Sequence, residues 1–227
     1  MTLPVGEAKT RLVREMFDDI APRYEFVNRL MTLGLDARWR KATVRDLRLP
    51  ADSLVLDVAT GTGDFVRELA KNGYRVVGTD LSWGMLFAGA FTTPVVQADA
   101  SRLPFQTGIF DGLTCGYALR NFTDLAATFS EMARVTRPGG RISFLEVSEP
   151  SSAFLRFGFN LWFRRAVPLI GALVSDRQAY RYLPRSTAYL PPATVISEML
   201  VSAGFTAVNH REILGGLSQR FIATRRA

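Results

Sequence analysis

Short apolar segments alternate with helical segments through the middle of the chain, and this alternation restricts the possible folds more than any other feature of the sequence. The apolar segments are residues 54–58, 75–79, 94–97, 110–115 and 142–145. Continuous apolar runs of this length, separated by helices, are typical of parallel strands that are buried on both faces of a sheet. The alternation therefore predicts an α/β fold built on a mostly parallel sheet.

The flanking segments complete the prediction of a single domain. Before the sheet, large apolar residues recur at helical spacing between breaks at Pro22 and Gly34. Within the core, a helix over 124–135 is expected to stop at Pro138-Gly139-Gly140. The predicted order is a helical cap (1–50), a core (51–150), a helical insertion that covers a pocket (151–190), and a final helix with two closing strands (191–227).

Charge and cysteine content restrict the partners and the compartment. The chain carries a formal net charge of +7 and a pI near 10.1, but its arginines are scattered rather than gathered in a basic arm, so no nucleic-acid partner is expected. Cys115 is the only cysteine, which excludes an intrachain disulfide and suits a reducing compartment. No apolar run approaches ~20 residues and the start does not resemble a signal peptide, so a cytoplasmic protein is expected.

Ligands of an open parallel sheet bind beyond the carboxyl ends of its strands, so the residues after each apolar segment are the first candidates. The first segment leads into the small-residue turn Ala59-Thr60-Gly61-Thr62-Gly63, where a ligand can approach the backbone amides closely. The second leads into Asp80, at the spacing of a carboxylate that binds ribose hydroxyls, and the third into Asp99-Ala100, which can receive an adenine edge. The order predicts a cofactor that contains adenosine.

Two features of the turn leave alternatives open. A glycine turn by itself is also found as a plain strand-to-helix connection. A nicotinamide dinucleotide would need a third small residue where Val66 stands, so the pyrophosphate fingerprint is incomplete. Asp57 fits a direct ligand role and a structural role, in which its carboxylate caps the amides of the turn, equally well.

Together these motifs resemble those of class I S-adenosylmethionine-dependent methyltransferases, and within them the ubiquinone/menaquinone biosynthesis C-methyltransferase family, which includes demethylmenaquinone methyltransferase. The resemblance covers nearly the whole chain, and its most specific segments are Leu119-Arg120-Asn121 and Tyr180-Arg181-Tyr182-Leu183. It implies a Rossmann-like fold with a seven-stranded, mostly parallel sheet and a C-terminal antiparallel strand. It also implies methylation of demethylmenaquinol to menaquinol, with S-adenosyl-L-homocysteine as the second product and no metal.

The resemblance also implies residue roles. It assigns cofactor contacts to Thr62, Asp80 and Asp99-Ala100, beside the close approach expected at Gly61 and Gly63. Gly116 stands where the family often has serine, so a contact there would come from the backbone. Asp36 stands where the family usually has histidine, and no role of that histidine can be carried over.

Methyl transfer is an in-line displacement, so the protein mainly has to align the acceptor and exclude water. A quinol ring carbon also needs a polar group that removes or polarises a phenolic proton. Tyr117, Arg120 and Asn121 follow the fourth apolar segment and are the catalytic candidates. Arg120 could stabilise a phenolate or orient a water; the alternative is an ion pair with Asp124 that only fixes the loop. Glu146 could reach the pocket or serve packing.

Residues further along the chain carry weaker expectations. Tyr180 and Tyr182 could line the acceptor pocket, with packing inside the insertion as the alternative. His210, the only histidine, is expected to be structural because it falls in a closing strand. Residues 153–170 combine aromatics with arginines. This composition fits a helix at a membrane interface and also an amphipathic lid packed on the sheet. Transient contact with the inner membrane face and a homodimer are compatible with this interpretation.

Two rival functions remain open at the level of sequence. A methyltransferase of the same fold that acts on another small molecule or on RNA would suit the basic pI, although the residues after the fourth segment, Cys115-Gly116-Tyr117-Ala118, lack an amino-methylation signature. A non-catalytic lipid-binding module is the second rival, since a fold does not fix a function.

Overall fold

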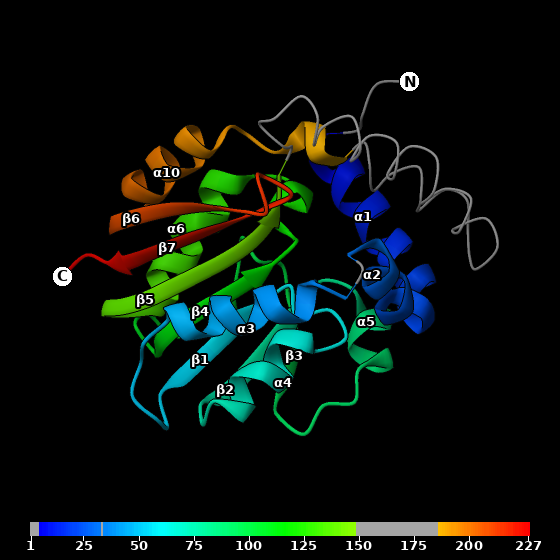
Figure 1. Ribbon diagram of the computed structural model, residues 1–227, viewed down its shortest axis with the longest axis horizontal. Coiled ribbons are helices and arrows are strands. Elements are labelled where there is room, and N and C mark those ends of the chain that lie inside the picture. Colours follow the sequence, from blue (N-terminus) through cyan, green and yellow to red (C-terminus); the bar gives the residue numbers. More distant parts are fainter. Residues whose placement is uncertain (1–4, 33, 149–185) are drawn as a thin grey trace.

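Seven strands form one sheet in the computed structural model, which describes residues 5–32, 34–148 and 186–227 (Figure 1). The sheet order is β3-β2-β1-β4-β5-β7-β6. Strands β1 to β5 run parallel, and β7 lies antiparallel between β5 and β6. The strands are β1 (Leu54–Val58), β2 (Arg75–Asp80), β3 (Val95–Gln97), β4 (Phe110–Gly116), β5 (Thr136–Val147), β6 (Phe205–Ile213) and β7 (Ser218–Arg225). This confirms the predicted sheet.

Helices cover both faces of the sheet (Figure 1). Leu56 and Val58 of β1 pack into one buried cluster with α6 and α10, whereas Val55 packs into another with α3 and α4. Successive side chains of a strand point to opposite faces, so a sheet covered on both faces needs continuous apolar runs. The helices are α1 (Gly6–Ile20), α2 (Tyr24–Met31), α3 (Asp36–Asp46), α4 (Asp64–Lys71), α5 (Trp83–Ala88), α6 (Leu125–Val135) and α10 (Ala193–Ser202), with 3₁₀-helices at Ala21–Arg23, Leu119–Asn121 and Thr187–Tyr189.

The first two helices gather with α5 at one end of the molecule (Figure 1). Val13, Met16 and Ile20 of α1 form a small buried cluster with Met85 of α5. A hydrogen bond reinforces this contact, because the Ser82 hydroxyl at the start of α5 donates to Asp18 Oδ1 at 2.6 Å. Helices α1 and α2 therefore form a cap that packs beside the strand ends, whereas α3, the last helix before the sheet, covers one face of it.

The Pro-Gly-Gly turn differs from the expectation. The sequence places a turn at residues 137–140 before the strand, whereas β5 already begins at Thr136. Thr136 pairs with Phe110, and the next pair in the ladder is Arg141 with Gly112. Proline lacks a ladder donor, so these residues are absorbed as an irregularity at the start of the strand instead of delaying it.

Most of the predicted insertion lies outside the described residues, including Tyr180, Tyr182 and the helix expected at 153–170. Among the helices of the described ranges, none has the length and apolarity needed to cross a membrane.

Candidate active site

The turn after β1 is held by the carboxylate that ends β2. The Gly61 amide donates to Asp80 Oδ2 at 2.8 Å, and the Ser82 amide donates to Asp80 Oδ1 at 2.9 Å. Gly61 and Gly63 have φ angles of 57° and 91°, in the left-handed region that favours glycine. Burial raises the pKa of Asp80 to about 6, although both amide bonds oppose that shift. The carboxylate keeps free lone pairs on each oxygen for a further donor.

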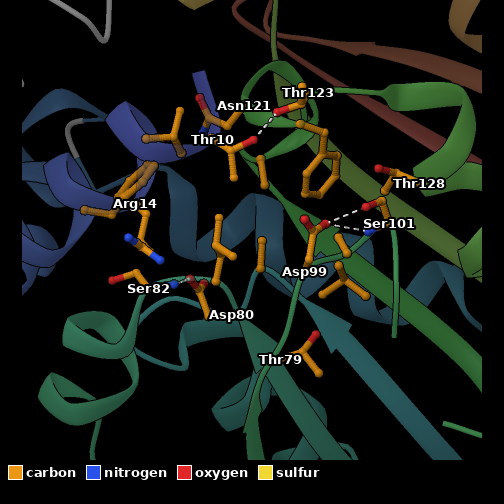
Figure 2. Close-up of a pocket in the computed structure, with 18 of the residues that line it drawn as sticks. Thr10, Arg14, Thr79, Asp80, Ser82, Asp99, Ser101, Asn121, Thr123 and Thr128 are labelled. Atoms are coloured by element: carbon orange, nitrogen blue, oxygen red, sulfur yellow. Dashed lines mark hydrogen bonds between the residues drawn. The ribbon is translucent and has the colours of Figure 1, made fainter. Parts of the chain in front are cut away.

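A cavity of about 370 Å³ opens above the carboxyl ends of the parallel strands (Figure 2). Residues from the ends of four strands line it: Gly61, Asp80, Asp99, Ala100 and Gly116. Figure 2 shows Asp80 and Asp99 directed into the same space, with Asn121 on the opposite wall. The Asp99 carboxylate accepts hydrogen bonds from the Ser101 amide and hydroxyl, both at 2.8 Å. The structure therefore brings these predicted residues together around one cavity.

The remaining predicted cofactor residues, Asp57, Thr62 and Gly63, are not among the residues that line the cavity. Asp57 is 1% exposed, and its Oδ1 accepts a 2.7 Å hydrogen bond from Thr114 Oγ1 in the neighbouring strand. Burial raises the pKa of Asp57 to about 7. Thr62 is also buried, and its hydroxyl donates to Glu25 Oε1 at 3.1 Å. Gly63 is the N-cap of α4. These residues therefore hold the turn and the strand before it by contacts within the protein.

Arg120 forms an ion pair different from the one considered from the sequence. Its guanidinium is buried against the carboxylate of Glu146, and it also donates to the Tyr117 carbonyl at 2.6 Å. Asp124 instead caps α6, where its Oδ1 accepts the Ala127 amide at 2.8 Å. Glu146 on β5 is fully buried and needs a counter-charge, which explains the partner that Arg120 takes.

The other two catalytic candidates border the cavity. Asn121 lines it from the 3₁₀-helix Leu119–Asn121. Tyr117 reaches it too, in a left-handed backbone conformation with φ of 57°, but its ring packs against the cluster beneath α3 and α4. Burial raises the pKa of the Tyr117 hydroxyl above its usual value. Asn121 is therefore the candidate whose side chain is best placed for an acceptor.

Helix α1 contributes a wall that sequence reasoning missed. Thr10, Val13, Arg14 and Phe17 lie at helical spacing and all line the cavity. Two adjacent bonds fix this wall to residues 119–124, called the acceptor loop below. Lys9 Nζ donates to the Phe122 carbonyl at 2.7 Å, and the hydroxyls of Thr10 and Thr123 are 2.6 Å apart. The signal that could have found this wall is the row Thr10, Arg14 and Phe17, which runs along α1 beside the buried row Val13, Met16 and Ile20.

Tyr24, at the start of α2, was also missed as a cavity residue. Burial raises its pKa to about 12.

His210 lies on β6 at the edge of the sheet, where its Nε2 is 2.9 Å from Gln219 Oε1 and its ring packs on Phe221. The prediction that His210 falls in a closing strand is confirmed, and its contacts there are those of a structural side chain.

A sequence model described as the ubiE/COQ5 methyltransferase family matches residues 5–225. The chain belongs to the ubiE/COQ5 methyltransferase family. A demethylmenaquinone methyltransferase of Roseiflexus castenholzii is 42% identical over 231 residues, covering 98% of this chain and 96% of that protein. The ubiquinone/menaquinone biosynthesis C-methyltransferase UbiE of Geobacter sulfurreducens is 38% identical over 224 residues, covering 92% of this chain and 87% of that protein.

Two solved structures of low sequence identity resemble this chain in fold alone. The [4+2]-cyclase SpnF has a TM-score of 0.71 at 14% identity, covering 99% of this chain and 98% of that one. A Haemonchus contortus phosphoethanolamine N-methyltransferase 2, solved with S-adenosyl-L-methionine, has a TM-score of 0.62 at 15% identity and covers 93% of this chain and 60% of that one. These likenesses confirm the class I methyltransferase fold.

Proposed function

We propose that this protein transfers a methyl group from S-adenosyl-L-methionine to a ring carbon of a prenylated quinol, converting demethylmenaquinol to menaquinol. The observation that carries the proposal is the cavity in which Asp80, Asp99 and the Gly61 turn meet at the carboxyl ends of the strands. Membership of the ubiE/COQ5 methyltransferase family and the names of the relatives support the reaction class and the acceptor.

The residues present fit this cofactor. A cavity of about 370 Å³ is within the range of small-molecule sites, roughly 300–1,000 Å³. The charged residues that line it in the described ranges are Glu7, Asp80, Asp99 and Asp124 against Arg14, so the wall is acidic although the whole chain is basic. An acidic wall favours a cationic sulfonium ligand and opposes a pyrophosphate or an RNA backbone. No cluster of potential metal ligands occurs among the described residues.

We assign the cofactor-binding roles by position. Asp80 accepts the ribose hydroxyls, and Asp99 with Ala100 receives the adenine edge, because these residues follow β2 and β3 at the cavity wall. Gly61 and Gly116 supply close backbone approach. Thr62 and Gly63 are assigned to hold the shape of the turn to which they belong, and Asp57 to support it from β1. When bound, the cofactor supplies an electrophilic methyl group on sulfur.

On the acceptor side, the protein has to orient the quinol ring and to polarise or remove a phenolic proton. Asn121 lies at the wall and carries an amide that can both donate and accept, and we assign to it the orientation of a quinol hydroxyl. Arg120 and Glu146 compensate each other's charge, so the pair holds the loop and contributes a local dipole rather than a free cation. Tyr117 contributes its backbone, which the pair fixes through the carbonyl. The proposed acceptor contacts of Tyr180 and Tyr182 lie outside the described residues.

A lipophilic acceptor favours transient contact with a membrane surface, and we propose this as part of the function. Exposed aromatic side chains accompany the cap: Phe26 on α2, and Trp83 and Phe87 on α5. Such side chains enter the lipid interface in peripheral proteins. We expect the protein to sediment with anionic liposomes and to be released by salt; recovery entirely in the supernatant would refute this association.

The function is tested by transfer of a labelled methyl group. Incubation with methyl-labelled cofactor and a panel of reduced demethylated quinols should label a ring-methylated product, detected by mass spectrometry. Asp80→Ala should weaken cofactor binding, whereas Asn121→Ala should keep that binding and lose transfer. Absence of transfer to every quinol in the panel would overturn the proposal.

A further inference from the structure

Five charged side chains form a continuous chain of ion pairs beside the glycine turn. Asp36 Oδ2 lies 2.6 Å from Arg40 Nη1, which lies 3.0 Å from Asp64 Oδ2. Asp64 Oδ1 lies 2.6 Å from Arg67 Nη2, which lies 2.7 Å from Glu25 Oε1. This charge chain links three helices that are separate in sequence, α2, α3 and α4.

The two ends of the charge chain differ in exposure. Asp36 is 1% exposed and also accepts hydrogen bonds from Thr32 Oγ1 at 2.8 Å and Asn28 Nδ2 at 3.4 Å. At the other end, the side chains of Glu25 and Arg67 are 36% and 37% exposed. A buried, fully bonded carboxylate is a fixed point, so the geometry of the open end is set from the buried end.

The exposed end, Glu25 and Arg67, binds the carbonyl and the hydroxyl of Thr62. Arg67 Nη1 donates to the Thr62 carbonyl at 2.8 Å, while the Thr62 hydroxyl donates to Glu25 at 3.1 Å. Thr62 stands between Gly61 and Gly63, two residues with positive φ and no side chain to restrain them. When a ligand binds to such a turn, ordering the turn costs conformational entropy. Contacts that already hold the turn in the free protein reduce this cost.

We propose that Arg67 is a positioning residue for the cofactor: through the charge chain it fixes Thr62, and so keeps the Gly61 amide on Asp80 before the cofactor arrives. The inference rests on the proposed function, because it concerns the affinity of that same site. The guanidinium suits this task, since its planar fork reaches the Thr62 carbonyl and two carboxylates simultaneously. Without the Arg67 guanidinium, the residues that line the cavity stay in place but the glycine turn is free to move.

Arg67→Met tests the proposal, because methionine keeps the apolar stem and removes the fork. We expect the dissociation constant for S-adenosylhomocysteine, measured by calorimetry, and KM for the methyl donor to rise about tenfold. At saturating donor, kcat should stay within about twofold. Glu25→Gln should weaken binding less, and the double variant should fall short of the product of the two single effects, because both act on Thr62.

Arg137→Met is the matched control. Arg137 is also an arginine on the surface, 47% exposed and 2.6 Å from a carboxylate, Asp111, but it lies where β4 and β5 begin. We expect unchanged donor affinity in this variant. Arg67→Lys keeps the charge without the fork, and we expect an intermediate affinity; it takes the place of Arg67→Met if that variant does not fold.

The outcomes distinguish a failure of the positioning role from a failure of the proposed function. A folded Arg67 variant that binds S-adenosylhomocysteine as tightly as the wild type would overturn the positioning role while leaving the function untouched. A loss of kcat at saturating donor with unchanged affinity would overturn it as well. Wild-type protein that binds no adenosyl cofactor would overturn the proposed function itself.

Discussion

Cofactor affinity should depend on the ionisation of Asp80. Burial raises the pKa of this carboxyl from 3.8 to about 6, and the charge of Asp18 on α1 adds to the rise, while amide bonds from Ser82 and Gly61 oppose it. An ionised carboxylate is acceptor-only and suits two ribose hydroxyls, whereas the protonated form gives up part of that capacity. The cofactor should therefore bind preferentially to the ionised form.

The size of the effect follows from the pKa. With a pKa of about 6, Asp80 is almost fully ionised at pH 8 and about one-tenth ionised at pH 5, so affinity should fall about tenfold between these values. Each further unit of acidification costs about 1.4 kcal/mol of binding free energy. Folding stability has the opposite sign: the folded protein holds this proton more tightly than the unfolded chain, so the contribution of Asp80 declines as pH rises from about 4 to about 6.

Calorimetric titration with S-adenosylhomocysteine from pH 5 to pH 8 measures this dependence. Asp80→Asn, which cannot ionise, should bind more weakly at pH 8 and show little change with pH. A wild-type affinity that is constant over the range would refute the reasoning. If Asp80→Asn retained the wild-type slope, the titrating group would be another one, and Asp57, whose pKa burial raises to about 7, would be the candidate.

Three further substitutions test other parts of the site. Gly116→Ala would bring a methyl group into the ring of Phe65, so we expect about 1–3 kcal/mol lower stability and weaker cofactor binding, measured by thermal melting and calorimetry. Glu146→Gln leaves the buried Arg120 charge uncompensated and should cost about 3–5 kcal/mol of unfolding free energy in a denaturant titration; a change below about 1 kcal/mol would contradict the buried pair. Lys9→Met removes the bond from α1 to the acceptor loop and should raise KM for the quinol severalfold, with about 1 kcal/mol lower stability; an unchanged KM would contradict that attachment.

The strand pattern was predictable because it depends on a local rule. A strand covered on both faces must be apolar throughout, so the runs ending at Val58 and Asp80 could be located without knowing their neighbours. The proposed cofactor residues followed from the same rule, since parallel strands bring their carboxyl ends to one edge. That reasoning placed Asp80 and Asp99 around one cavity, as the structure has them.

The partners of the polar side chains were not predictable in the same way. Arg120 could reach Asp124 along the chain, but it pairs with Glu146, 26 positions further on. That choice depends on β4 and β5 lying side by side and on Glu146 being fully buried, neither of which is a property of the local sequence.

The sequence by itself determined the parallel sheet, the glycine turn and the order of the carboxylates, because backbone geometry and side-chain period act over a few residues. Tertiary structure alone decided that α1 walls the cavity and that Glu25 and Arg67 hold Thr62 from two helices. Contacts between helices are set by how buried faces fit together, and ion pairs follow whichever charges that packing brings within reach. The residues proposed to bind the cofactor could thus be located along the chain, whereas the contacts that position them required the fold.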